Sequence, residues 1–200
     1  EKVEELGPPF LSDKYAVTCV AFMPDNKTLV SGGGDGTVRV WDVSRATPKE
    51  LSPFNEIACY AMSVAFSPDG KTIAAGSLDG SVRLWNVTAD EPKERPSIQT
   101  GSFVRALMFS PDGKTLAYGG ALDGTTNVCL ADVSNEQTAV LVRIGHHSDH
   151  ILSLAFSSDG KSLAYSAGAD LGVRILDVAG SETKIRQVLK QSSVVSSLAF

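Results

Sequence analysis

The chain has 200 residues, of which 42% are hydrophobic and 20% are charged, and its formal net charge is −5 at pH 7. This balance is typical of a folded globular protein and argues against general disorder. The acidic charge is spread along the chain without a basic cluster, and no apolar run approaches the roughly 18 residues that cross a bilayer, so neither nucleic acid nor a membrane is an expected partner.

The N-terminal stretch and the cysteines bear on the cellular compartment. Residues 1–6 show neither a signal-peptide pattern nor an initiator Met, so we expect a cytoplasmic protein of which this chain is a fragment. Cys19, Cys59 and Cys129 form no Cys-x-x-Cys pair. They are therefore expected to be buried small hydrophobic residues in a reducing compartment, with neither a disulfide framework nor a structural zinc site.

In chain order, the first expected element is a β-hairpin. Strand-like runs extend from Val17 to Phe22 and from Lys27 to Gly32, and the turn between them contains Pro, Asp and Asn. Pro presets φ, Asp suits the next position, and Asn accepts the positive φ that follows. A second turn at Asp35-Gly36 leads to a third expected strand from Val38 to Asp42.

The same order of elements recurs along the whole chain. A Phe ends the first strand of each unit at intervals of 44, 43, 47 and 44 residues, at Phe22, Phe66, Phe109, Phe156 and Phe200. The Asp-containing first turn follows the first four of these, and a second turn recurs at Asp79-Gly80, Asp123-Gly124 and Asp170-Leu171-Gly172. A period of this length with two phased turns indicates a tandem repeat of all-β units.

A weaker apolar run completes each unit and predicts a fourth strand at a sheet edge. It is clearest from Thr138 to Ile144 and from Lys184 to Leu189. The expected units are therefore four-stranded and antiparallel. Their approximate bounds are 15–58, 59–101, 102–147 and 148–192, and a further unit starts at 193–200.

Several dipeptides resemble the signatures of the WD-repeat family, whose blades are four-stranded sheets of about 40 to 45 residues. Trp41-Asp42 and Trp85-Asn86 match the Trp-Asp signature, and Gly145-His146 matches the Gly-His signature before the fourth unit. The resemblance extends from about Tyr15 to Phe200. It implies that residues 1–200 form one segment of a β-propeller, with its strands arranged in antiparallel blades.

The resemblance also implies a hydrogen-bonded network inside each blade, made by a His, a Ser or Thr, the turn Asp and the Trp. The first unit offers Ser31, Asp35 and Trp41 without a His. The fourth offers His146 or His147, Ser166 and Asp170 without a Trp. Because no unit is complete, the blades are expected to depend more on apolar packing. The residues assigned a structural role are Asp35, Trp41, Asp79, Trp85, Asp123 and Asp170.

Two other groups of polar residues have structural interpretations. The turn aspartates occur once per repeat, so each is expected to serve its own turn and not catalysis. Arg39, Arg83 and Arg174 share one position on the third strand, which favours packing or solvation over phosphate binding. The cluster from His146 to His150 could suggest a metal site, but we interpret it as the Gly-His loop of a blade because no second ligand group exists to complete it.

Propellers of this family usually bind partners on the face that carries the loops before the first strand and between the second and third strands. Carried onto this sequence, those loops contain large apolar or aromatic side chains, which are what a recognition patch requires. The alternative is that the same side chains fold inward against the next blade. The candidate partner-binding residues are Tyr15, Tyr60, Leu78, Phe103, Leu122 and His150.

No catalytic, metal or cofactor motif is found, since Gly-x-Ser-x-Gly, Gly-x-x-x-x-Gly-Lys and His-Glu-x-x-His are all absent. We therefore expect a non-catalytic scaffold that binds other proteins or peptides. A regulatory or targeting propeller within a larger enzyme is the alternative, and a propeller hydrolase is a weaker one. The resemblance implies a ring of seven or eight blades, which needs about 300 to 350 residues at this period. The ring is therefore expected to be incomplete and to expose sheet edges prone to aggregation.

Overall fold

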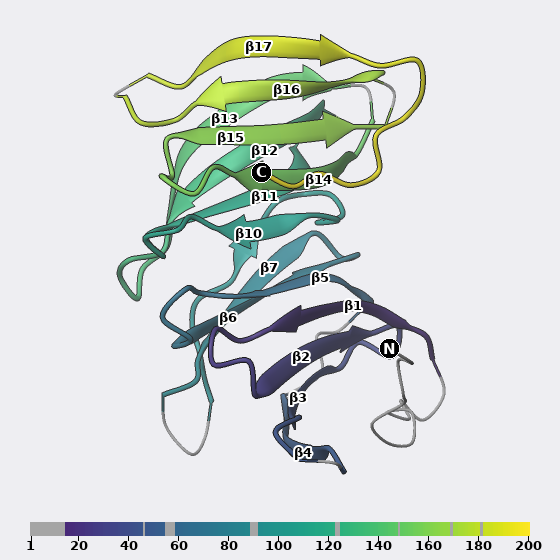
Figure 1. Ribbon diagram of the computed structural model, residues 1–200, viewed down its shortest axis with the longest axis vertical. Helices are drawn as coiled ribbons and strands as arrows, with labels where there is room; N and C mark the ends of the chain where they lie inside the picture. The colour runs from purple at the N-terminus through teal and green to yellow at the C-terminus, as the bar shows by residue number, and fades with distance from the viewer. Residues whose placement is uncertain are drawn as a thin grey trace, which may run out of the picture.

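The protein is built from antiparallel β-sheets that stack one on another along the long axis of the molecule (Figure 1). The computed structural model describes residues 15–45, 47–54, 59–88, 92–122, 125–147, 149–168, 170–180 and 182–200. All regular elements within these ranges are strands. They include no helix long and apolar enough to cross a membrane. The all-β expectation is confirmed.

Each sheet is formed by strands that follow one another in the chain. The strands are β1 (Val17–Phe22), β2 (Thr28–Gly33), β3 (Val38–Asp42), β4 (Lys49–Phe54), β5 (Ala61–Phe66), β6 (Thr72–Ser77), β7 (Ser81–Asn86), β8 (Lys93–Glu94), β9 (Ile98–Gln99), β10 (Leu107–Phe109), β11 (Thr115–Leu122), β12 (Thr125–Asp132), β13 (Ala139–His147), β14 (Ile151–Phe156), β15 (Ser162–Ala167), β16 (Gly172–Asp177) and β17 (Lys184–Lys190).

The sheet order is sequential in every case: β1-β2-β3-β4, β5-β6-β7-β8, β10-β11-β12-β13 and β14-β15-β16-β17. In the second sheet the outer strand is split, because β8 and β9 both pair with β7. The first strands pack against one another from sheet to sheet, β1 on β5, β5 on β10 and β10 on β14. This is the arrangement of propeller blades, and the ring that they begin is not closed (Figure 1).

The turns after the first strands have the backbone that the sequence predicts. The residue that follows the turn Asp has a positive φ in all four: 56° at Asn26, 70° at Gly70, 71° at Gly113 and 69° at Gly160. In the third sheet, Asp112 Oδ1 accepts hydrogen bonds from Ser110 Oγ at 2.6 Å and from the backbone N–H of Lys114 at 3.1 Å. The turns of the second and fourth sheets repeat both bonds. Each carboxylate thus rigidifies its own hairpin.

These hydrogen bonds make stability depend on pH. The Ser hydroxyl bond, followed by the backbone bond from Lys, lowers the pKa of Asp69, Asp112 and Asp159 below the ordinary value. Because an unfolded Asp titrates near ~3.9, the stabilisation is fully present above that pH and is lost as pH falls through the lowered folded pKa values. We therefore expect the melting temperature to decrease when the pH is lowered below about 4. The melting temperature is measured as a function of pH. Its decrease in acid should be smaller when Ser67, Ser110 and Ser157 are all replaced by Ala. An equal decrease in that variant would show that the Ser–Asp hydrogen bonds are not its cause.

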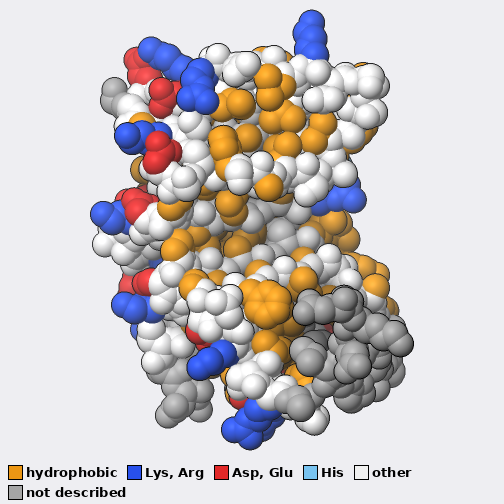
Figure 2. Space-filling view, in the orientation of Figure 1, with side chains coloured by type: hydrophobic (Ala, Val, Ile, Leu, Met, Phe, Trp, Pro, Cys, Tyr) orange, Lys and Arg blue, Asp and Glu red, His pale blue; other side chains and the backbone are white. Residues whose placement is uncertain are grey.

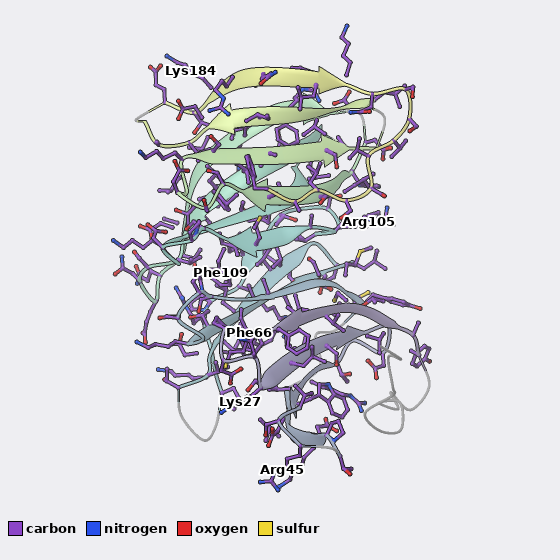
Figure 3. The ribbon with its side chains drawn as sticks, in the orientation of Figure 1. Lys27, Arg45, Phe66, Arg105, Phe109 and Lys184 are labelled. Atoms are coloured by element: carbon purple, nitrogen blue, oxygen red, sulfur yellow. The ribbon has the colours of Figure 1, made fainter. Side chains whose placement is uncertain are left out.

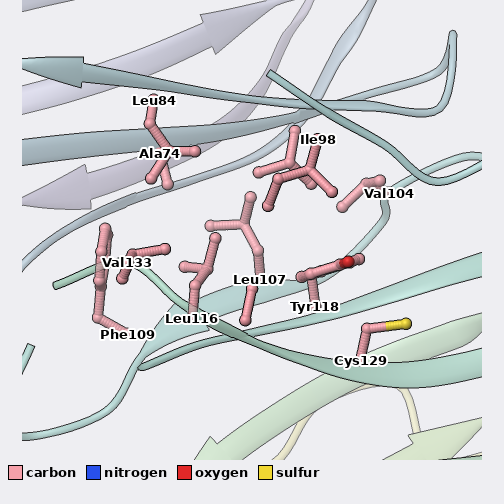
Figure 4. Close-up of a cluster of buried hydrophobic side chains, with 12 residues drawn as sticks. Ala74, Leu84, Ile98, Val104, Leu107, Phe109, Leu116, Tyr118, Cys129 and Val133 are labelled. Carbon is pink, nitrogen blue, oxygen red and sulfur yellow. The ribbon is translucent and has the colours of Figure 1, made fainter. Parts of the chain in front are cut away.

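Apolar side chains from two neighbouring sheets form each junction (Figure 4). The junction between the second and third sheets is a single buried cluster of Ala74, Val82, Leu84, Ile98, Val104, Leu107, Phe109, Leu116, Tyr118, Cys129, Ala131 and Val133. Equivalent clusters fill the other two junctions. The core of the protein therefore lies between blades, which gives the loops at either end a rigid support.

The two ends of the strands differ in charge. Most of the Lys, Arg, Asp and Glu side chains visible in Figure 2 gather along the left-hand side, where the Asp-containing first turns lie. The opposite side carries the loops before the first strands and between the second and third strands. Figure 3 places Lys27 on the turn side and Arg105 on the loop side.

Candidate interaction face

Backbone hydrogen bonds join the two kinds of loop that form the candidate face. The N–H of Leu78 donates to the carbonyl of Tyr60 at 3.0 Å, which places the loop before β5 directly beside the loop after β6. In the first and fourth sheets the matching bonds run from Gly34 to Ala16, 2.9 Å, and from Gly168 to His150, 3.0 Å. Backbone hydrogen bonds between residues next to the strand ends thus join the two loops in these three sheets.

Three aromatic side chains on this face are substantially exposed. The exposed fractions are 54% for Tyr15, 45% for Tyr60 and 41% for Phe103, while Leu78 and His150 are half-buried. The bond to Gly34 shows that Ala16, and not Tyr15, occupies the position of Tyr60 in the first sheet. Phe103 also stands apart from its strand, because β10 begins only at Leu107.

Tyr60 crosses from the second sheet to the first. A Cβ placed on Gly34 would lie 2.9 Å from Tyr60 Cε1 and 3.4 Å from Tyr15 Cβ. The absence of a side chain at Gly34 therefore lets the Tyr60 ring contact the neighbouring loop, with Tyr15 beside it. This contact joins two blades while leaving nearly half of the Tyr60 side chain open to solvent.

Phe103 and His150 form a second contact across blades. Their ring centroids are 5.0 Å apart with an interplanar angle of 43°. The His150 backbone N–H donates to Asp149 Oδ1 at 2.7 Å, which steadies the loop on which the ring is carried. The candidate residues of the third and fourth sheets are thus brought together, as those of the first and second sheets are.

The turn aspartates of this face bind groups in their own turns. Asp35 Oδ1 accepts from the N–H of Thr37 at 3.0 Å and from its hydroxyl at 2.7 Å. Asp79 makes the same pair of bonds to Ser81, at 2.8 and 2.6 Å. Arg174 Nη1 lies 2.6 Å from Asp170 Oδ2. Asp123 lies outside the described residues, as does the side chain of Leu122.

The two Trp residues occupy equivalent, buried positions. Trp41 Nε1 donates to Ser31 Oγ at 2.8 Å inside the first sheet. Trp85 is 2% exposed, and Ala75 holds the position of Ser31 in its sheet.

Two assignments in the fourth unit are corrected. Strand pairing shows that Tyr165, and not Ser166, is the counterpart of Ser31, because Tyr165 pairs with Arg174 as Ser31 pairs with Arg39. The Gly-His dipeptide is also not in a loop before the fourth blade. It belongs to β13, in which the backbone of His147 pairs with Thr126. The fourth strand simply extends further than its apolar pattern indicates.

The side chains of His146 and His147 lie outside the described part of the structure. Among the residues that are described, no group of three or more His, Cys, Asp and Glu is placed to hold a metal ion.

Sequence reasoning did not assign a contact to Gly34 or to Asp149. In the sequence Gly34 is only the residue before a turn Asp, and nothing in the repeat indicates that the Tyr60 ring packs against it. Asp149 belongs to the histidine-rich stretch, where the pattern draws attention to metal ligands. The signal that could have found both is register, since Gly34 is itself bonded across the two loops and Asp149 directly precedes His150, which is bonded in the same way.

Comparison with known proteins agrees with this architecture. The family model described as "WD domain, G-beta repeat" matches residues 10–42, 56–86, 95–128 and 137–177. The chain is 61% identical over 33 residues to the Notchless protein homolog of Arabidopsis thaliana, a match that covers 16% of this chain and 7% of that protein. It therefore spans a small part of that relative.

A chain in the crystal structure of the mitotic checkpoint complex has the same fold. The TM-score is 0.77 at 20% sequence identity, and the match covers 92% of this chain and 57% of that one. Four matched repeats and a propeller architecture establish the family: the chain belongs to the WD40 family of G-beta repeat proteins.

Proposed function

We propose that this chain is a non-catalytic scaffold that binds a protein or peptide on the face formed by Tyr15, Tyr60, Leu78, Phe103 and His150, which we call the aromatic face. The observation that carries the proposal is the exposure of three aromatic side chains at the ends of rigid sheets. Aromatic rings bury a large area at a small entropic cost, and such residues are enriched in binding hot spots.

The contacts between blades add to this argument. Tyr60 rests against the Gly34 loop and Phe103 against His150, so their rings are held in place before a partner arrives. A side chain that is already ordered loses less entropy on binding than a mobile one. The aromatic face therefore combines open apolar surface with preorganisation.

The carboxylates on this face favour binding over catalysis. Asp35 and Asp79 each accept two hydrogen bonds within their own turns, which commits them to holding those turns. WD40 propellers are generally interaction scaffolds, and the mitotic checkpoint complex is itself an assembly of proteins. Both observations support protein partners for this chain.

The test begins with a peptide selected for binding to the intact chain from a displayed random library. Tyr60→Ala and Phe103→Ala are each expected to weaken binding of that peptide at least tenfold, as truncation of a hot-spot residue does at about 1.4 kcal/mol or more. The affinities are measured by titration calorimetry, and the melting temperature of each variant is measured alongside.

Leu141→Ala serves as the control, because Leu141 is an exposed apolar residue on β13, in the outer strand and away from the aromatic face. It should bind the peptide as the wild type does. If Tyr60→Ala and Phe103→Ala instead lower the melting temperature and leave the affinity unchanged, the two rings serve packing and the proposal fails.

A further inference from the structure

A buried arginine crosses the junction between the second and third sheets on the turn side. Arg95, the residue after β8, is 8% exposed. Its Nη1 donates to the Val133 carbonyl at 3.1 Å, and its Nη2 donates to the Asn135 carbonyl. Asp132 and Glu136 add negative charge around the guanidinium. The same side chain lines a cavity of about 470 Å³ between the two sheets. One planar cation thus binds two carbonyls of the turn opposite it.

The third and fourth sheets border the equivalent cavity, whose volume is about 670 Å³. The two cavities are equivalent because residues at the same positions of the repeat line them. The N–H of Val178 donates to the Lys161 carbonyl as that of Val133 donates to the Lys114 carbonyl. The matched lining residues, with that of the smaller cavity first in each pair, are Asp112 and Asp159, Val133 and Val178, and Asn135 and Gly180.

A leucine holds the position of Arg95 in the larger cavity. Arg95 follows Glu94, and Leu141 follows Val140, which pairs within its sheet as Glu94 does. Leu141 lines the cavity, is 58% exposed and carries no side-chain donor. No described residue donates a hydrogen bond to the two matched carbonyls of the fourth sheet. The larger cavity therefore offers the same acceptors as the smaller one, while its own chain supplies no guanidinium to them.

The charges that line the two cavities also differ. Lys71, Lys114 and Arg95 line the smaller one together with three acidic residues. The described lining of the larger one contains no Lys or Arg, and its acidic residues are Asp112 and Asp159. Each of these carboxylates accepts a Ser hydroxyl bond that lowers its pKa, so both are charged at neutral pH. The larger cavity is therefore complementary to a cation.

The remaining lining selects among cations. Leu130, Val142 and Phe156 contribute apolar surface, which accommodates the aliphatic stem of a long basic side chain. Two carbonyls on one turn match the planar fork of donors on a guanidinium better than the single point charge of an ammonium. An arginine side chain satisfies both requirements, as Arg95 does in the smaller cavity.

We propose that the cavity between the third and fourth sheets binds an arginine side chain of a partner peptide, in the way that Arg95 binds between the second and third sheets. The guanidinium donates to the carbonyls of Val178 and Gly180, and Asp112 and Asp159 balance its charge. The site requires only these two sheets. It lies on the turn side, opposite the aromatic face, and does not depend on the function proposed there.

The first test uses the peptide Gly-Gly-Arg-Gly-Gly with blocked termini, titrated into the intact, isotope-labelled chain and followed by NMR. The backbone amides of Thr115 and Gly180 should shift and reach saturation. A peptide with citrulline in place of arginine has the same shape without the charge, and a lysine peptide has the charge without the fork. Each is expected to bind at least about tenfold more weakly than the arginine peptide.

Leu141→Arg supplies the arginine from the chain itself. It is expected to weaken binding of the arginine peptide at least about tenfold by intramolecular competition. Val188→Arg is the matched control, because it adds the same side chain at an exposed position of β17 that does not line the cavity. It should bind the peptide as the wild type does. Since a guanidinium in the cavity satisfies two carbonyls, Leu141→Arg should also melt at a higher temperature than Val188→Arg.

Four results overturn the proposal. They are equal binding of the arginine and citrulline peptides, equal binding of the arginine and lysine peptides, no saturable binding of the arginine peptide, and binding by Leu141→Arg as strong as that by Val188→Arg. A lower melting temperature of Leu141→Arg than of Val188→Arg contradicts the placement of the guanidinium. Tyr60→Ala should bind this peptide as the wild type does, so failure at one face leaves the proposal for the other intact.

Discussion

Replacing Phe109 with Ala is expected to lower the free energy of unfolding by about 3–5 kcal/mol, as buried Phe→Ala substitutions do. Phe109 lies in the cluster that joins the second and third sheets, together with Leu84 of the second sheet and Leu116 of the third (Figure 4). Removal of the ring loses its transfer free energy and leaves a cavity that two sheets border. Because the core lies between blades, loss of the Phe109 ring weakens the packing between the second and third sheets as well as the third sheet itself.

The repeat supplies its own control for this prediction. Phe22 holds the same position in the first sheet but is exposed, so Phe22→Ala should change the free energy of unfolding by no more than about 0.5 kcal/mol. Both are measured by urea denaturation. Equal losses in the two variants would mean that the Phe positions stabilise the fold through their own hairpins and not through the junctions between sheets.

Much of the fold could be predicted from the sequence because each turn motif recurs in all four repeat units. The strand Val17–Phe22 and the strand Val38–Asp42 begin and end where the pattern places them. The turn chemistry is equally readable, since a Pro-Asp-Gly or Pro-Asp-Asn run specifies its backbone almost alone. The outer strands are less readable. They lie at a sheet edge, where fewer neighbours constrain the side chains, and the split into β8 and β9 leaves no mark in the apolar pattern.

The contacts of the candidate face depend on register between blades, which one sequence does not display. When the residues before the first strands are simply aligned, Tyr15 is assigned as the equivalent of Tyr60. The backbone hydrogen bonds show that Ala16 is the equivalent residue. Likewise, the sequence assigns Ser166 to the hydrogen-bonded network inside its blade, but Ser166 lies at the position where the other sheets have glycine. Both errors are shifts of a single residue, and in a strand such a shift moves a side chain to the opposite face.

Gly76→Val is expected to lower the free energy of unfolding by about 3 kcal/mol, at the upper end of the usual cost of overpacking. A Cβ at Gly76 would lie 2.5 Å from Val104 Cγ1 and 2.7 Å from the Val104 carbonyl oxygen. The methyl group can rotate away, but the carbonyl belongs to the backbone segment that leads into the next sheet at β10. Relief therefore requires the two sheets to separate. Gly32 and Gly119 occupy the same place in their sheets and meet side chains of the next sheet at 2.8 Å or less.

At Ser166, the equivalent position of the fourth sheet, a substitution is expected to raise the free energy of unfolding instead of lowering it. It pairs with Ser153 as Gly76 pairs with Ser63, yet it carries a side chain, and the face that it borders meets segment 191–200. Its buried Oγ has no hydrogen-bond partner among the described residues. Ser166→Ala should therefore raise the free energy of unfolding by up to about 1 kcal/mol, and Gly180→Val, at an open surface site, should change it by less than about 0.5 kcal/mol. If Gly76→Val proves as mild as Gly180→Val in urea denaturation, close approach of the sheets is not what excludes a side chain there.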